Sequence, residues 1–82
     1  MPFSITVSEK EGIQTVGLQG RLTLGVEEVI FRDCIGALVA HGKNRIVVNL
    51  GGVTEIDEPG MESILCARVK CQEDRGRLAA CV

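Results

Sequence analysis

The sequence predicts an α/β fold in which helices pack on a small mixed β-sheet. Two observations lead to this prediction. Strand-like apolar segments alternate with two segments of helical periodicity, and the first two strand-like segments are separated only by a polar turn. Because strand–helix–strand units pair their strands in parallel, we expect an N-terminal antiparallel hairpin followed by three parallel strands. The 82 residues are enough for one small domain, which we place at residues 1–82.

The first half of the chain is expected to form the hairpin and one helix. Phe3–Val7 alternates between apolar and polar residues, and Ile13–Leu18 follows a polar turn, so both segments predict strands. Thr23 or Gly25 can cap the following helix, and Gly42 suits the left-handed conformation in which helices often end. The apolar residues at helical spacing, which we expect to face the core, are Val26, Ile30, Phe31, Cys34, Ile35, Ala37, Leu38 and Val39.

The second half is expected to add two strands and a second helix. Arg45–Leu50 is rich in β-branched residues without alternation, which predicts a central strand covered on both faces. Gly51-Gly52 is expected to form a turn. The second helix should have Pro59 at its first position and should stop at Asp74–Gly76, and Arg77–Val82 starts a fourth strand. The apolar face expected for this helix consists of Met61, Ile64, Leu65 and Val69.

Composition argues against several functions. The formal net charge is -2, and the chain has two Phe but no Trp or Tyr, so we expect no nucleic-acid binding. The N-terminus lacks a signal-peptide pattern, and no apolar run approaches about 20 residues, which predicts a cytoplasmic protein. His41 stands alone and no Cys-x-x-Cys pair occurs, so we expect no metal and no cofactor. The cysteines are expected to be reduced and mostly buried; they are Cys34, Cys66, Cys71 and Cys81.

Residues 46–65 contain the candidate site. This stretch leads from the third strand into residues 57–60, where either Asp57 or Glu58 can cap the second helix. The N-terminus of a helix attracts anions, but the carboxylates of this segment already supply negative charge, so a phosphate ligand is not expected. Gly60 would let another chain approach the backbone closely. We therefore expect a protein-binding surface rather than a catalytic centre.

The order of the elements and several local motifs resemble the STAS domain family. This is the fold of bacterial anti-sigma-factor antagonists and of the cytosolic tail of sulphate transporters. The resemblance covers essentially the whole chain, and the order and spacing of its motifs are more specific than any one of them. The matching residues are Leu18-Gln19-Gly20-Arg21-Leu22 with Gly25, Ile46-Val47-Val48-Asn49-Leu50 with Val53, Ile56-Asp57 with Gly60, and Gly76-Arg77-Leu78.

The resemblance implies a regulatory function. In that family a partner anti-sigma kinase phosphorylates a serine or threonine before the second helix, and the added charge breaks the complex. The acceptor position falls on Glu58, and Pro59 and Asn49 also depart from the family pattern. The resemblance thus implies a non-catalytic regulator that is phosphomimetic or independent of phosphorylation, with an anti-sigma factor kinase or another STAS-binding protein as its partner. The implied partner-binding residues are Asp57, Glu58, Pro59, Gly60, Met61 and Glu62.

Alternatives concern the setting of the domain. The same fold could be an accessory or scaffold subunit of a stress-signalling complex or a membrane transporter. An enzyme is not expected, because nothing places a second catalytic group beside Asp57, Glu58 or a cysteine. Members of the family usually continue with a helix, a strand and a helix after the position of Val82. We therefore expect a shortened chain, or apolar surface on the sheet or second helix that a partner or a second copy covers, as in a homodimer.

Overall fold

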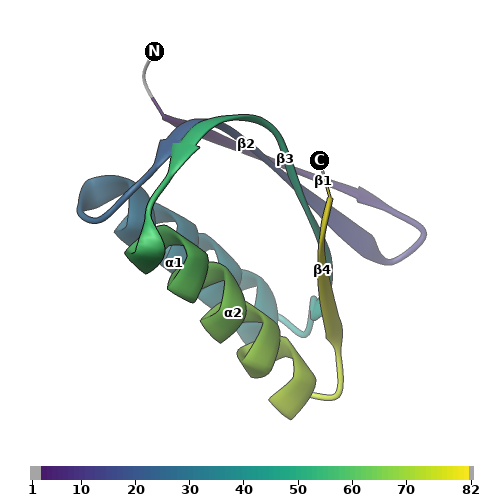
Figure 1. Cartoon of the computed structure of the whole chain (residues 1–82). Coiled ribbons are helices and arrows are strands. Elements are labelled where there is room, and N and C mark those ends of the chain that lie inside the picture. The colour runs from purple at the N-terminus through teal and green to yellow at the C-terminus, as the bar shows by residue number, and fades with distance from the viewer. Residues whose placement is uncertain (1–2, 82) are drawn as a thin grey trace.

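The structure is a computed structural model that describes residues 3–81. It contains a four-stranded sheet and two helices, and the strands lie side by side in the order β1-β2-β3-β4 (Figure 1). β1 and β2 pair antiparallel, whereas β2, β3 and β4 are parallel, which confirms the predicted mixed sheet. Val82, the last residue expected in the fourth strand, lies outside the described residues. The elements are β1 (Ser4–Lys10), β2 (Ile13–Leu22), α1 (Val26–Ala40), β3 (Arg45–Ile56), α2 (Glu58–Glu73) and β4 (Arg77–Cys81).

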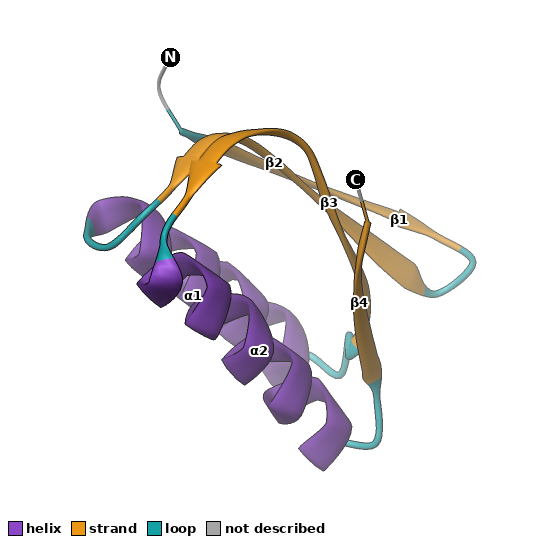
Figure 2. Ribbon diagram, viewed as in Figure 1, coloured by secondary structure: helices purple, strands orange, loops and turns teal. Residues whose placement is uncertain are grey.

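Both helices cover the same face of the sheet (Figure 2). The prediction that the third strand is covered on both faces is therefore wrong. The crossovers β2-α1-β3 and β3-α2-β4 each lead to the next strand in the same direction across the sheet. Right-handed crossovers that run in one direction place their helices on the same face of the sheet. Along β3, Ile46 and Val48 are buried against the helices, Val47 is only partly buried and Asn49 is exposed.

β3 is longer than predicted because Gly51-Gly52 continues the strand instead of forming a turn. Its register against β2 shifts twice, between Gly17 and Gln19 and again between Gly20 and Arg21. A Cβ atom on Gly52 would lie 2.8 Å from the Leu18 carbonyl oxygen, so a glycine is needed for this close approach. These irregularities bend the strand, which arches over the helices and leads its end to α2 (Figure 1). β2 likewise continues to Leu22, four residues beyond its predicted end.

Backbone geometry defines the helix ends. Gly25 is the N-cap residue of α1, with φ of 121° and no side-chain hydrogen bond, so Thr23 does not cap the helix. Gly42 has φ of 76°, which confirms its predicted role. The Gly42 N–H donates to the Val39 carbonyl and the Lys43 N–H to the Leu38 carbonyl. These two bonds form a Schellman motif that satisfies the last carbonyl groups of α1.

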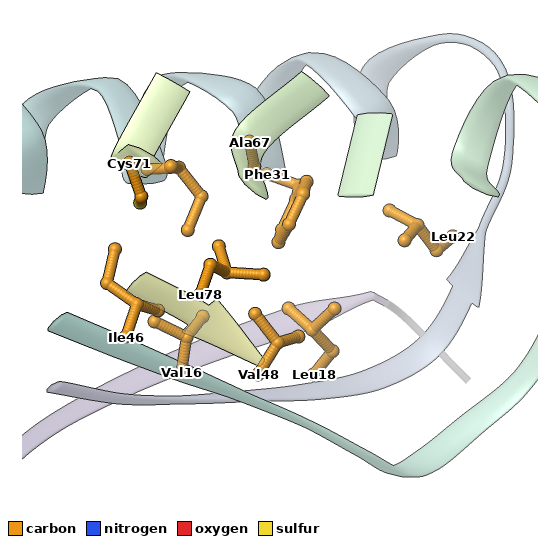
Figure 3. Close-up of a cluster of buried hydrophobic side chains, with 10 residues drawn as sticks. Val16, Leu18, Leu22, Phe31, Ile46, Val48, Ala67, Cys71 and Leu78 are labelled. Carbon is orange, nitrogen blue, oxygen red and sulfur yellow. The ribbon is translucent and has the colours of Figure 1, made fainter. Parts of the chain in front are cut away.

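The core lies between the sheet and the helices (Figure 3). α1 contributes Phe31 and Ile35, which are 0% and 2% exposed. The residues of α2 that are buried are all small: Gly60, Ser63, Ala67 and Cys71. The other buried hydrophobic residues of the core are Val16, Leu18, Leu22, Ile46, Val48 and Leu78.

The predicted apolar faces of the helices are partly wrong. Met61, Leu65 and Val69 were expected in the core, yet all three are more than half exposed. Leu65 stands two residues from both Ser63 and Ala67, about 200° around the helix, so it points away from the sheet. The small residues bring α2 close to the sheet and turn its larger apolar residues outward. On α1, Val26 and Ile30 are also exposed, because the buried side of that helix is centred on Phe31 and Ile35.

The cysteines and the histidine show no clustering. All four cysteines are free thiols, but only Cys71 is buried, so the expectation of mostly buried thiols is wrong for Cys66 and Cys81. Burial raises the pKa of the Cys34 and Cys71 thiols, with a further contribution from Asp74 at Cys71. Within residues 3–81, no three or more His, Cys, Asp or Glu residues gather closely enough to hold a metal ion. Neither α1 nor α2 is long and apolar enough to cross a bilayer.

Two isoleucines of α1 provide a matched test of the packing. Ile35 is 2% exposed and Ile30 is 43% exposed. Ile35→Ala should lower the free energy of unfolding by about 2–5 kcal/mol because it opens a cavity, whereas Ile30→Ala should cost under about 1 kcal/mol. Urea unfolding followed by circular dichroism measures both. If I35A does not fold, Ile35→Val and Ile30→Val replace the pair, and equal losses would contradict the observed packing.

Candidate functional site

Asp57 is the N-cap residue of α2 and holds two backbone segments together. Its Oδ1 accepts a hydrogen bond from the Gly60 N–H at 2.8 Å, and its Oδ2 accepts one from the Leu24 N–H at 2.9 Å. The bond from Leu24 and, to a smaller extent, the bond from Gly60 hold the pKa of Asp57 below its usual value. Of the two predicted caps Asp57 is therefore the one used, and Glu58 is the first helical residue. Pro59 occupies the second position rather than the predicted first, where a missing N–H is equally harmless.

Gly60 is buried against the chain's own β2 strand. A Cβ atom at this position would overlap the Leu22 carbonyl oxygen and crowd the Ile56 side chain. The close approach predicted for Gly60 therefore exists, but the segment that approaches is β2 and not another chain. The contact sets the distance between the end of β2 and the first turn of α2.

The residues of this end that reach solvent are Glu58, Met61 and Glu62, whereas Pro59 is partly buried. Met61 is 53% exposed. Of the six residues predicted to bind a partner, the structure thus presents three openly and uses Asp57 and Gly60 for internal contacts. We call Glu58, Met61, Glu62 and the neighbouring Leu24 the Glu58 surface.

Leu24 is a member of this surface that the sequence analysis did not identify. Its side chain is 68% exposed, and its N–H bond to Asp57 fixes it beside the start of α2. Val26, two residues further along, is 70% exposed and extends the apolar surface along α1. The sequence offered little signal for this, because Leu24 lies in a connection and Val26 fits the helical apolar stripe.

The nearby hydroxyl groups do not occupy the exposed helix end. Ser63 is 2% exposed, and its Oγ donates to Glu28 Oε1 at 2.9 Å and to the Pro59 carbonyl at 3.0 Å as alternatives. Glu28 also accepts from Arg32 at 3.3 Å, so Ser63 belongs to the contact between the helices. Thr54 is exposed on β3, before the helix. Neither residue lies at the position of Glu58.

Comparisons with known proteins identify the fold. No protein-family model matches this sequence, and no curated protein sequence does either. Among solved structures, the unphosphorylated anti-sigma factor antagonist SpoIIAA is 18% identical, with a TM-score of 0.78 over 96% of this chain and 71% of that chain. A candidate anti-sigma factor antagonist from Thermotoga maritima is 16% identical, with a TM-score of 0.84 over 93% of this chain and 65% of that chain. The protein Mglu is 25% identical, with a TM-score of 0.80 over 92% of this chain and only 18% of that chain.

The chain therefore has the STAS fold of the anti-sigma factor antagonists, as its motifs predicted. SpoIIAA has been solved with the same fold in its phosphorylated form. The chain spans about two thirds of the antagonists and less than a fifth of Mglu. At these identities the likeness establishes the fold.

The two bonds to Asp57 predict how stability depends on pH. Because they favour the carboxylate, the pKa of Asp57 is lower in the folded protein than the value of about 3.9 expected for an unfolded chain. The stabilisation is complete above the unfolded-state pKa and is lost as pH falls through the folded-state pKa. The stability difference between wild type and Asp57→Asn should thus be constant from pH 7 to pH 5 and shrink in more acidic buffer. Urea unfolding across this range measures it, and a difference that grows with acidity would contradict the assignment.

Two glycines in helices should respond oppositely to the same substitution. Gly60→Ala should lower the free energy of unfolding by about 1–3 kcal/mol, because the new methyl group overlaps the Leu22 carbonyl. Gly36→Ala is the control. Its Cβ would meet only Lys70 Nζ at 3.8 Å, so higher helix propensity should raise stability by about 0.5–1 kcal/mol. Urea midpoints compare the variants. A neutral or stabilising Gly60→Ala would show that the close contact between Gly60 and Leu22 does not require a glycine.

Proposed function

We propose that this protein is a non-catalytic, protein-binding regulator of the anti-sigma factor antagonist type. Its partner in this proposal is an anti-sigma factor kinase or another STAS-binding protein in the cytoplasm. The similarity of its fold to SpoIIAA and to the Thermotoga maritima protein supports the class of function. The observation that carries the finer proposal is the exposure of Glu58 as the first residue of α2, the acceptor position that the family resemblance assigns.

The charge at this position is fixed in this protein. A phosphate on a serine or threonine adds about -1.5 to -2 charges, which can be added and removed, whereas the Glu58 carboxylate is part of the chain. Glu58 lies next to the positive end of the α2 dipole, and Glu62 lies one turn further along the helix. A partner that faces the Glu58 surface therefore always meets negative charge. The protein behaves either as a permanently modified form or as a regulator that needs no modification.

Internal contacts account for the other polar groups of the site. Asp57 is engaged by two backbone N–H groups and Ser63 by Glu28 and Pro59, which leaves Glu58 and Glu62 to meet a partner. His41 is exposed at the opposite end of the neighbouring helix, where its Nδ1 lies 2.8 Å from the Ala37 carbonyl oxygen. This separation supports a binding role over acid–base catalysis, which requires the reacting groups to be within hydrogen-bond reach.

A second candidate function is an accessory module within a larger assembly. The likeness to Mglu supports it, because the same fold there makes up only 18% of a longer chain. The apolar residues Met61, Leu65 and Val69 lie outward at successive turns of α2 and are suited to a contact with another domain or with a second copy. A homodimer through this surface stays a prediction.

Replacing the fixed charge by a hydroxyl tests the leading proposal. Glu58→Ser should raise the affinity for the cognate anti-sigma kinase at least about tenfold if like-charge repulsion opposes binding. In a regulator that works without modification, affinity should stay the same while the kinase phosphorylates the new hydroxyl. Calorimetry and incorporation of labelled phosphate measure the two effects, with Glu73→Ser at the other end of α2 as the control. Unchanged affinity together with no phosphate incorporation would contradict the proposal.

A further inference from the structure

The uncovered face of the sheet carries a row of cations that the sequence did not reveal. Arg45 and Arg77 are register partners at the start of β3 and β4, and Lys10 is the partner of Ile13 beside the turn of the hairpin. Gln14 of β2 and Ile46 of β3 are register partners, so the residues before them, Ile13 and Arg45, also lie next to each other. Gln14, Ile46 and Leu78 are buried toward the helices, so the residues before them point to the other face. The row across the four strands is Lys10, Ile13, Arg45 and Arg77.

Charge is divided unequally between the two faces of the molecule. Of the described residues, those on the uncovered face carry a net charge of +3, from Lys10, Arg21, Arg45 and Arg77 against Glu55. Since the whole chain has a formal charge of -2, the remainder carries -5. The overall charge therefore conceals a positive sheet face, and the helices lie on the other side of the sheet (Figure 2).

The cations of the row have no internal partner. The ion pairs of the described residues are Arg21–Glu55, Arg32–Glu28 and Lys43–Glu9, and none includes Lys10, Arg45 or Arg77. Like charges on neighbouring strands repel, so the Arg45–Arg77 pair opposes folding slightly unless an anion lies between them. The acids next to Lys10 in sequence are Glu9, which pairs with Lys43, and Glu11, which lies in the hairpin turn.

We propose that this face, centred on Lys10, Arg45 and Arg77, binds an acidic extended segment of a partner protein. Arginine side chains bind carboxylates through paired hydrogen bonds, and the row spans about 14 Å at the usual spacing between strands. An extended segment of about five residues covers that length. Thr15, Val47 and Ala79, the next residues inward, are small and uncharged and leave room for its backbone. This surface is on the opposite face from the Glu58 surface and is independent of it.

Other anionic partners fit the face less well. The chain has no Trp or Tyr, Phe31 is buried and Phe3 packs against the core, so no aromatic side chain is available for a nucleic-acid base to stack on. Trp and Tyr are also the residues that commonly anchor proteins at a membrane interface. The sheet arches with its uncovered face outward (Figure 1), which suits a narrow segment better than a flat bilayer.

An NMR titration tests the proposal. The ¹⁵N-labelled protein is titrated with an acetylated hexaglutamate peptide at low ionic strength. Amide shifts should move saturably at Lys10, Ile13, Arg45 and Arg77, and the movement should disappear when salt is added. The double variant Arg45→Glu with Arg77→Glu should bind at least about tenfold more weakly and should instead bind hexalysine, because the sign of the row is reversed. Its ¹⁵N spectrum shows directly whether it is folded.

Arg68→Glu is the matched control, since Arg68 is exposed on α2 and outside the row. This substitution lies on the opposite face and changes the net charge by half as much as the double variant does. The affinity for hexaglutamate should stay within twofold of the wild-type value. Shifts confined to the helices, an equal loss in the control, or no saturable shift would overturn the proposal. Tighter binding to hexathymidylate or to phosphatidylserine vesicles than to hexaglutamate would overturn the assignment of a protein partner.

Discussion

The carboxylate of Asp57 determines the geometry of the site. Its two oxygens accept N–H bonds from Leu24, before α1, and from Gly60, in the first turn of α2. These residues are far apart in the sequence, so a single side chain links the entry of one helix to the start of the other. Gly60 completes the link, because its missing side chain lets the end of β2 lie against the helix. The exposure of Glu58 follows from this arrangement, since the residue before it faces inward to cap the helix and leaves Glu58 as the first residue that points to solvent.

Local patterns were sufficient to predict most of the fold. The hairpin, the parallel strands, the capped second helix and the left-handed Gly42 each depend on a few neighbouring residues. The packing of the helices could not be predicted in the same way. α2 contacts the core through glycine, serine, alanine and cysteine, whereas an apolar periodicity argument favours the large residues Met61, Leu65 and Val69. Which side of such a helix faces the sheet depends on how closely the backbones approach, and that distance is a tertiary property.

The two glycine positions show where the sequence argument failed. Gly51-Gly52 has the composition of a turn, yet the pair lies within a strand because β2 and β3 pair irregularly there. The Asn49 side chain accepts a hydrogen bond from the Gly51 N–H at 2.8 Å and so supports this irregular segment from outside the ladder. Gly60 was expected to let another chain approach the backbone, but the segment that approaches is the chain's own β2. Both errors concern contacts with β2, which lies more than 30 residues away in the sequence.

Net charge was the least informative property of the sequence, because pairing of strands sorts the charges by face. Lys10, Arg45 and Arg77 are separated by 35 and 32 positions and come together only through the sheet register. Most of the acidic residues lie in or beside the two helices, among them Glu58 and Glu62. Since the two surfaces have opposite sign and lie on opposite faces, occupation of one leaves the other accessible, and a partner suited to one is repelled by the other. A small domain with two such faces can distinguish partners by charge alone, even though its overall charge is close to neutral.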